Sequence, residues 1–263
     1  MKDNSCPVTF VGAGPGDPEL ITVKGRRRIM EADLVLYAGS LVPREVVSCA
    51  KKGARVLDSS SMPLEEIHEA VMDVVRSGGT VARVHTGDPS LYGAVKEQMK
   101  LLDREKVPYQ VIPGVTAGFA AAAAAKVSLT VPEATQTVIF ARAAGRTPVP
   151  DKEELRNLST HQCTIVLYLS ASRVDEVAKG LLDGGYPPHT TVVVGHRIGW
   201  EDETILFTTL SRLAAEVKDK GIKRQAVFLV LPGEEGEARS RLYDAAFSHG
   251  FRHGKTGPQK DGG

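Results

Sequence analysis

Three short segments carry residue types that bind small molecules through the backbone, and each directly follows a short apolar run. They are Gly-Ala-Gly-Pro-Gly-Asp at residues 12–17, His-Thr-Gly-Asp-Pro at residues 85–89 and Pro-Gly-Val-Thr-Ala at residues 113–117. Glycine lets the backbone approach a ligand closely, and N–H groups at the start of a helix can face a polar or anionic group. The second segment adds an imidazole at His85 and a carboxylate at Asp88, two groups that commonly accept protons. The pattern indicates a ligand site built from strand-to-helix turns.

The glycine-rich segment departs from the spacing of a dinucleotide site. It reads G-x-G-x-G, one residue short of G-x-G-x-x-G, and Pro15 removes an amide donor inside the turn. The apolar run at residues 34–37 ends in Ala-Gly-Ser instead of the acidic residue that binds a ribose. A nicotinamide or flavin oxidoreductase is therefore a disfavoured alternative. For the segment at residues 85–89, an ordinary βα turn is the alternative, because Gly-Asp-Pro is a common turn tripeptide.

Hydrophobic periodicity places these segments within alternating strands and helices. Strands are predicted over residues 8–11, 34–37, 55–57, 81–84 and 109–112, and then over 137–141, 164–169, 191–195, 204–208 and 226–231. Helices are predicted over residues 19–31, 64–76, 92–103, 119–125, 152–157, 173–184 and 210–220. Only eight residues join the strands at 191–195 and 204–208, too few for a helical crossover, so this pair is expected to be antiparallel. The fold class is α/β, with a mostly parallel sheet followed by a mixed sheet.

The chain is expected to divide where its pattern changes, near residue 130. This predicts an amino-terminal α/β domain over residues 1–130 and a carboxyl-terminal mixed α/β domain over residues 131–248. The tail at residues 249–263 is rich in Gly, Lys, Gln and Asp and is predicted to be disordered.

Composition narrows the class of protein. The 263 residues include 33 Lys and Arg against 32 Asp and Glu, and a net charge of +1 provides no global attraction to nucleic acid or to an anionic membrane. Three cysteines without a C-x-x-C pair argue against a disulfide framework or a protein-bound metal. The amino terminus does not read as a signal peptide and no apolar run is long enough to span a bilayer. A cytoplasmic protein is expected.

In their order and separation, the three segments resemble the tetrapyrrole methyltransferases that use S-adenosylmethionine, over about residues 7–233. Segments within residues 37–43, 85–92, 136–139 and 145–150 resemble the subgroup that methylates C11 of precorrin-4 in cobalamin synthesis. The segment Gly-His-Arg-Ile-Gly-Trp at residues 195–200 departs from that subgroup, where a tyrosine near His196 and an alanine-serine pair before the tryptophan are expected. The resemblance implies methyl transfer from S-adenosylmethionine to C11 of precorrin-4 or cobalt-precorrin-4, giving the corresponding precorrin-5.

The same resemblance implies two α/β domains with the cofactor in the cleft between them, and a homodimer. It implies that S-adenosylmethionine is the only cofactor. The residues that it assigns to the cofactor come from both domains: Pro15, His85, Thr86, Gly87, Asp88, Tyr92, Thr116, Ala117, Tyr168, Leu169, Gly195, His196 and Ala226. Burial in the core is an equal alternative for Tyr168 and Ala226, which lie in apolar runs.

Methyl transfer from a sulfonium needs an acceptor carbon in line with the S–CH3 bond, and such positioning can contribute about 7–11 kcal/mol. A base is dispensable, and the weak candidates are His85, Asp88 and Glu133. The acetate and propionate groups of a precorrin need cations, because Arg binds carboxylates bidentately. Four arginines are candidates for this role: Arg142, Arg146, Arg197 and Arg44. Solvated loop charges are the alternative for them.

Other functions remain open at this point. A related methyltransferase could act on uroporphyrinogen III, another precorrin position, a diphthamide precursor or ribosomal RNA, although an RNA-binding protein is expected to be more basic. A dimeric binding module without catalysis is a further alternative. The sequence does not distinguish a cobalt-containing acceptor from a metal-free one.

Overall fold

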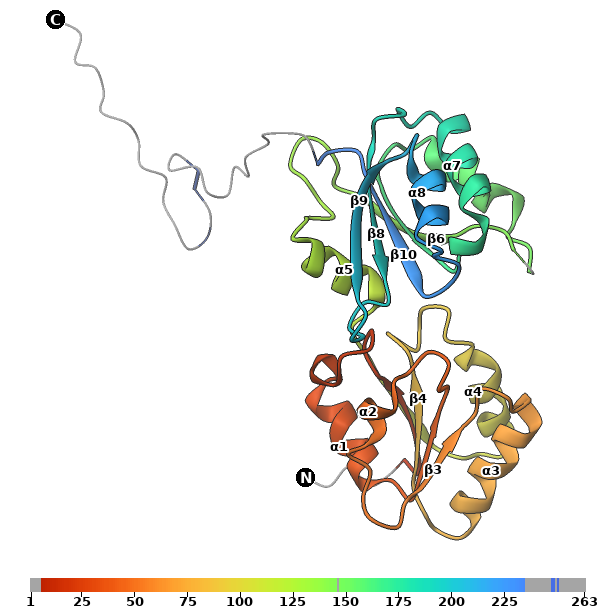
Figure 1. Cartoon of the computed structure of the whole chain (residues 1–263). Helices are drawn as coiled ribbons and strands as arrows, with labels where there is room; N and C mark the ends of the chain where they lie inside the picture. Colours follow the sequence, from red (N-terminus) through yellow and green to blue (C-terminus); the bar gives the residue numbers. More distant parts are fainter. Residues whose placement is uncertain (1–5, 146, 235–246, 249, 251–263) are drawn as a thin grey trace, which may run out of the picture.

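The computed structural model describes residues 6–145, 147–234, 247–248 and 250, and it contains two five-stranded sheets that follow one another in the chain (Figure 1). The first sheet has the order β3-β2-β4-β1-β5 and its pairs are parallel. Its strands are β1 (Val8–Gly12), β2 (Leu34–Tyr37), β3 (Arg55–Asp58), β4 (Val81–His85) and β5 (Tyr109–Ile112). The predicted parallel sheet is therefore confirmed.

The second sheet is mixed, with the order β6-β7-β10-β8-β9. Its strands are β6 (Val138–Arg142), β7 (Thr164–Tyr168), β8 (Thr191–His196), β9 (Thr204–Thr209) and β10 (Ala226–Leu231). The β6–β7 pair is parallel, while β10 pairs antiparallel with both β7 and β8, and β8 with β9. The antiparallel β8–β9 pair confirms the argument from the short connection.

Helices cover both sheets. Those that follow strands of the first sheet are α1 (Val23–Glu31), α2 (Arg44–Val47), α3 (Leu64–Arg76), α4 (Val95–Arg104) and α5 (Ala117–Ala125). The α-helices that follow are α6 (Leu155–Ser159), α7 (Val174–Asp183) and α8 (Leu213–Asp219). Short 3-10 turns occur at η1 (Pro18–Leu20), η2 (Asp151–Glu153) and η3 (Ala171–Arg173).

Alternation along β4 separates the two faces of the first sheet. Ala82 and Val84 pack in a core with Ile29 of α1, whereas Val81 packs in a second core with Ile67 of α3. Side chains of a strand point alternately to opposite faces. This central strand is therefore buried on both faces, as is typical of parallel sheets.

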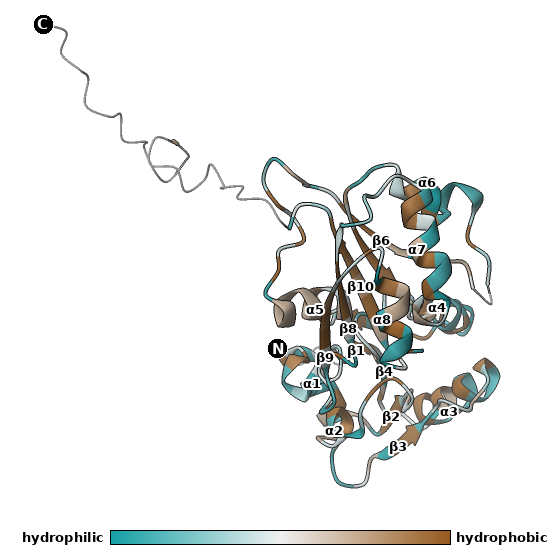
Figure 2. Cartoon of the chain, turned by 45° about the horizontal axis from the view of Figure 1, so that its top comes forward, coloured by the Kyte–Doolittle hydropathy of each residue, from teal (hydrophilic) through white to brown (hydrophobic). Residues whose placement is uncertain are grey.

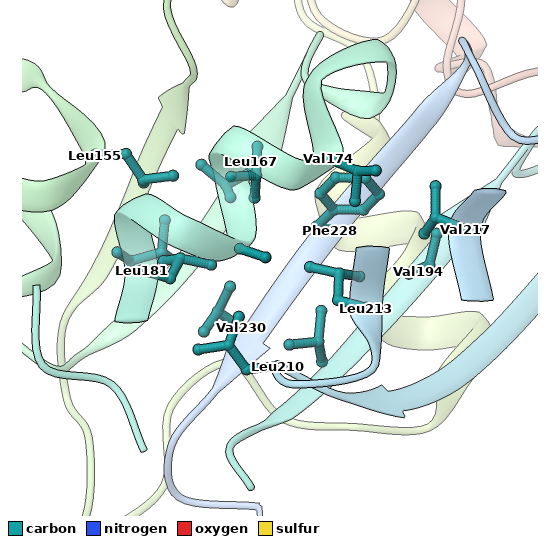
Figure 3. Close-up of a cluster of buried hydrophobic side chains, with 14 of the residues drawn as sticks. Leu155, Leu167, Val174, Leu181, Val194, Leu210, Leu213, Val217, Phe228 and Val230 are labelled. Atoms are coloured by element: carbon teal, nitrogen blue, oxygen red, sulfur yellow. The ribbon is translucent and has the colours of Figure 1, made fainter. Parts of the chain in front are cut away.

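The largest core of the second half lies between its sheet and α6, α7 and α8. Figure 3 shows residues of this core, among them Leu167, Phe228 and Val230 from the sheet and Leu181 and Leu213 from the helices. They are almost completely buried. The predicted apolar strands thus supply the face of the second sheet that packs against α6, α7 and α8.

The other face of the second sheet is covered by α5, as Figure 2 shows. Ala120, Ala121 and Ala122 pack on the strands, and a Cβ added at Gly195 of β8 would lie 2.8 Å from the Cβ of Ala121. The alanine-rich segment therefore provides close helix-on-sheet packing. Helix α5 precedes residue 130, the predicted limit of the first domain, but packs on the second sheet. The limits of the two domains remain a prediction. The predicted tail lies outside the described residues except for Gly250.

Candidate functional site

Four glycines bring the carboxyl-terminal tips of β1, β4 and β5 into contact. Gly14 and Gly87 exchange backbone hydrogen bonds, with N···O distances of 3.3 and 2.7 Å. A Cβ added at Gly114 would lie 2.1 Å from the carbonyl oxygen of Gly87, and one at Gly12 would lie 2.5 Å from the nitrogen of Gly114. Side chains at Gly12 and Gly114 would therefore force the turns apart.

Asp88 connects two of these turns through its carboxylate. Oδ2 accepts a hydrogen bond from the N–H of Gly114 at 3.0 Å, and Oδ1 accepts one from the N–H of Ser90 at 2.8 Å. Each oxygen thus binds a backbone amide, and charge-assisted bonds of this kind are stronger than neutral ones. The geometry favours a positioning role for Asp88 over proton transfer.

His85 ends β4, and its side chain is buried. Its ring lies 6.0 Å from that of Phe10, which belongs to the core on the α3 and α4 side of the sheet. Burial, together with the charge of Arg83, lowers the pKa of His85 to about 3, although a hydrogen bond with the Gly93 backbone acts in the opposite direction. Nε2 has no hydrogen-bond partner. His85 is neutral at pH 7 and a weak base, so it gains no support as a catalytic base.

The second half presents its predicted cofactor residues on one edge of its sheet. Because β6, β7 and β8 run in the same direction, their carboxyl ends lie together with the start of the antiparallel β10. Arg142 is in register with Tyr168, and Ala226 is in register with His196. Leu169 follows Tyr168 with a φ of 54° and is 68% exposed. The edge therefore offers backbone groups and an exposed apolar side chain to a ligand.

Tyr168 joins this edge to the turns of the first half. Its hydroxyl lies 2.8 Å from Oγ1 of Thr116 and accepts a hydrogen bond from the N–H of Gly118 at 2.9 Å. The ring of Tyr92, in the β4–α4 connection, lies 5.6 Å from the Tyr168 ring. Burial raises the pKa of Tyr168, so the hydroxyl remains protonated at neutral pH. Strand tips of both sheets thus converge on one region.

Two of the four arginines predicted to bind carboxylates are bonded to other groups of the protein. Arg142 donates hydrogen bonds to the carbonyls of Thr147 and Pro148 at 3.1 and 2.7 Å, within its own loop. Arg197 is bonded to Asp202, and Arg44 is exposed at the start of α2. Arg146 lies outside the described residues.

Glu133 is not brought to this region. It is exposed in a turn that precedes β6. The neighbouring Thr135 accepts, through Oγ1, a hydrogen bond from the N–H of Thr164, the first residue of β7. Because Tyr168 is the last residue of β7, Glu133 lies at the opposite edge of the second sheet.

Residues that the sequence analysis did not select also join the two halves. A Cβ added at Gly16 would lie 2.6 Å from Cδ1 of Trp200, and the side-chain amide of Gln225 donates to the carbonyl of Ser40 at 3.2 Å. Trp200 is the single tryptophan of the chain, but the sequence does not indicate which residue it contacts. Only the tertiary structure pairs it with Gly16.

The region suits an organic cofactor bound through the backbone, because the glycine turns have no side chains that would cover the main-chain groups at the strand tips.

Among the described residues, no group of three or more His, Cys, Asp or Glu side chains could hold a metal ion. In the same part of the chain, no helix is long and apolar enough to cross a bilayer. A separate groove of ≈ 530 Å³ lies over α1 and α2, lined by residues such as Val23, Arg27 and Cys49.

The two-sheet fold is that of a tetrapyrrole methylase. The chain belongs to the Tetrapyrrole (Corrin/Porphyrin) Methylases, whose family model matches residues 7–214. This is a family of methyltransferases. The resemblance stated from the three motifs is therefore confirmed.

Two curated relatives are similar to the chain over most of its length. A cobalt-precorrin-4 C(11)-methyltransferase from Methanocaldococcus jannaschii is 47% identical over 95% of this chain and 97% of its own. A protein of the same description from Priestia megaterium is 49% identical over 93% of this chain and 97% of its own.

The X-ray structure of a cobalt-precorrin-4 methyltransferase matches with a TM-score of 0.85 and 48% identity, covering 87% of this chain and 96% of that one. Uroporphyrin-III C-methyltransferase from Thermus thermophilus, in complex with S-adenosylhomocysteine, matches with a TM-score of 0.71 and 29% identity over 85% and 96%.

Proposed function

We propose that the chain transfers a methyl group from S-adenosylmethionine to C11 of cobalt-precorrin-4, giving cobalt-precorrin-5. The supporting observation is the agreement between the site and the relatives: glycine turns of one sheet meet the Tyr168 edge of the other, in a chain 47% identical to a cobalt-precorrin-4 methyltransferase. Metal-free precorrin-4 and other tetrapyrroles are the competing acceptors.

Cofactor binding is assigned to the converging strand tips. The sulfonium of S-adenosylmethionine supplies an electrophilic methyl group when it is bound. Pro15, Thr86 and Gly87 form the side provided by the first sheet, and Tyr92, Thr116 and Ala117 continue it. The second sheet contributes Tyr168, Leu169, Gly195, His196 and Ala226. His85 and Asp88 support the conformation of the turns that belong to the first sheet.

The reaction needs little from acidic or basic side chains. The electron pair of C11 forms the new carbon–carbon bond while the S–CH3 pair stays on sulfur, which yields S-adenosylhomocysteine. The chain contributes the in-line arrangement and the exclusion of water, and positioning can contribute about 7–11 kcal/mol. Neither His85, with its lowered pKa, nor the bonded Asp88 suits proton abstraction. We therefore propose positioning as the main catalytic contribution.

Acceptor binding is assigned to cations around this region. Arg142 ends β6 in register with Tyr168. Burial raises the pKa of Tyr92, and the nearby charge of Arg142 acts in the opposite direction. Arg44 and Arg146 are further candidates. The net charge of +1 supports a small-molecule partner over nucleic acid, and three cysteine thiols suit a reducing cytoplasm. We also propose a homodimer, whose mass light scattering measures.

Mass spectrometry of the product tests the proposed function. Purified protein is incubated with cobalt-precorrin-4 and methyl-13C-labelled S-adenosylmethionine, and the product is expected to gain one labelled methyl group, which NMR assigns to C11. Parallel incubations with precorrin-4 and uroporphyrinogen III compare the acceptors. Methylation of uroporphyrinogen III alone would contradict the proposed acceptor. Cofactor and acceptor binding with no mass gain would favour a binding module.

A further inference from the structure

Trp200 brings the second half of the chain directly against the glycine-rich loop. A Cβ added at Gly16 would lie 2.6 Å from Cδ1 and 2.8 Å from Nε1 of its indole. Gly199, with a φ of 78°, lies against the same loop, because a Cβ there would be 2.6 Å from the nitrogen of Asp17. The two loops therefore meet where neither glycine has room for a side chain.

Arg197 holds Trp200 in this position. The guanidinium carbon lies 4.2 Å from the centre of the indole ring, a distance typical of a cation–π contact. Nε donates to Oδ1 of Asp202 at 2.5 Å, and Nη1 donates to Oε1 of Gln225 at 2.8 Å. Arg197 also has a left-handed backbone with a φ of 50°. The guanidinium of Arg197 thus contacts three side chains of the protein.

Gln225 extends the same arrangement to a second loop of the first half. Its carbonyl accepts a hydrogen bond from the N–H of Arg197 at 2.8 Å, and its side-chain amide donates to the carbonyl of Ser40 at 3.2 Å. Ser40 lies between β2 and α2. One small group of residues therefore contacts both the glycine-rich loop and the β2–α2 loop.

We propose that Arg197, Trp200 and Gln225 form a clasp that positions the glycine-rich loop for the cofactor. Arg197 then acts as a positioning residue instead of a carboxylate ligand. This inference rests on the proposed function, because it takes residues 12–17 as part of the S-adenosylmethionine site. A loop already ordered before binding loses less conformational entropy when the cofactor arrives.

Calorimetry with S-adenosylhomocysteine tests the clasp without requiring turnover. Trp200→Ala is expected to weaken binding about tenfold, because the unclasped loop must be ordered on binding. Trp200→Phe keeps a flat ring and is expected to retain most of the affinity. Arg212→Ala is the matched control, since it removes an exposed ion pair with Glu216 on α8 and is expected to bind like the parent.

Hydrogen exchange separates a loosened loop from general destabilisation. In Trp200→Ala, amides in residues 12–17 and 38–42 are expected to exchange about tenfold faster, while those of β3 remain unchanged. Uniformly faster exchange would indicate a merely structural tryptophan and would overturn the clasp.

A double-mutant cycle tests the contact itself. Gly16→Ala places a methyl group against the indole and is expected to weaken binding in the parent chain. The same substitution in Trp200→Ala is expected to cost less, because the atom nearest to the new methyl is gone. Equal costs in both backgrounds would overturn the proposed contact. If the unmodified chain does not bind S-adenosylhomocysteine, the proposed function fails, whereas parent-like binding by Trp200→Ala rejects only the clasp.

Discussion

Several residues that were predicted to act in binding or catalysis also make bonds within the fold. Asp88 binds two backbone amides, Arg142 binds carbonyls of its own loop, and Arg197 binds Asp202. A polar side chain in a turn can stabilise the turn by bonding to backbone groups or to other side chains nearby. The residue type therefore predicts the kind of bond at these positions but leaves the partner open.

Burial of His85 should make the protein sensitive to mild acid. The folded chain resists protonating this imidazole until about pH 3, whereas the unfolded chain protonates it near the ordinary value of 6.5. The unfolded state then binds more protons, and stability should fall with falling pH by up to about 1.4 kcal/mol per unit. Denaturant unfolding of the parent and His85→Gln between pH 4.5 and 6.5 measures this slope.

The slope is expected to be shallower in His85→Gln. A smaller slope should persist, because burial and the charge of Arg197 also lower the pKa of His196. The range stays above pH 4.5 to limit the contribution of carboxylates such as Asp58, whose pKa is lowered mainly by a hydrogen bond from the Gly39 amide. An identical slope in both proteins would show that His85 is exposed or already paired.

At the scale of elements, packing explains where the sequence prediction and the structure differ. The predicted helix at residues 92–103 is observed as α4 (Val95–Arg104), because Tyr92 and Ala94 adopt positive φ angles of 57° and 48°. The short helix α2 was not predicted. Its four residues carry too little periodicity to distinguish a helix from a loop.

Small side chains on α5 are required by its contact with β8. Ala121 is completely buried, and its Cβ lies close to Gly195. Ala121→Leu should therefore overpack this interface and destabilise the fold by about 1–3 kcal/mol. Ala124→Leu, on the exposed part of the same helix, is the matched control. Urea unfolding measures both, and equal small effects would contradict the close packing of α5 on the sheet.

At the scale of the whole molecule, the site depends on how the two sheets face each other. Carboxyl ends of parallel strands form natural binding edges, and here one such edge from each sheet contributes. The hydrogen bond between Thr116 and Tyr168 joins residues 52 positions apart, and that between Ser40 and Gln225 joins residues 185 apart. A ligand at this junction should therefore couple the two halves.

Binding of S-adenosylhomocysteine is expected to protect both halves together. At a ligand concentration 100 times Kd, the free energy of unfolding should rise by about 2.7 kcal/mol. Hydrogen exchange should slow in residues 85–88 and in residues 195–196, because the proposed site takes backbone from both edges. Slower exchange in the first half alone would place the ligand on one sheet and contradict a shared site.

Local patterns predicted the strands, the change from a parallel to a mixed sheet and the three glycine turns, because periodicity and turn chemistry depend on neighbouring residues. Gly87 and Thr116 lie in contiguous motifs, and the family resemblance of these motifs assigned both residues to the cofactor. Three features follow from the folded arrangement alone: the pairing of Trp200 with Gly16, the bond of Arg197 to Gln225 and the packing of α5 on the second sheet. These contacts join segments far apart in the chain, and local propensities contain no information about which distant surfaces will bury one another.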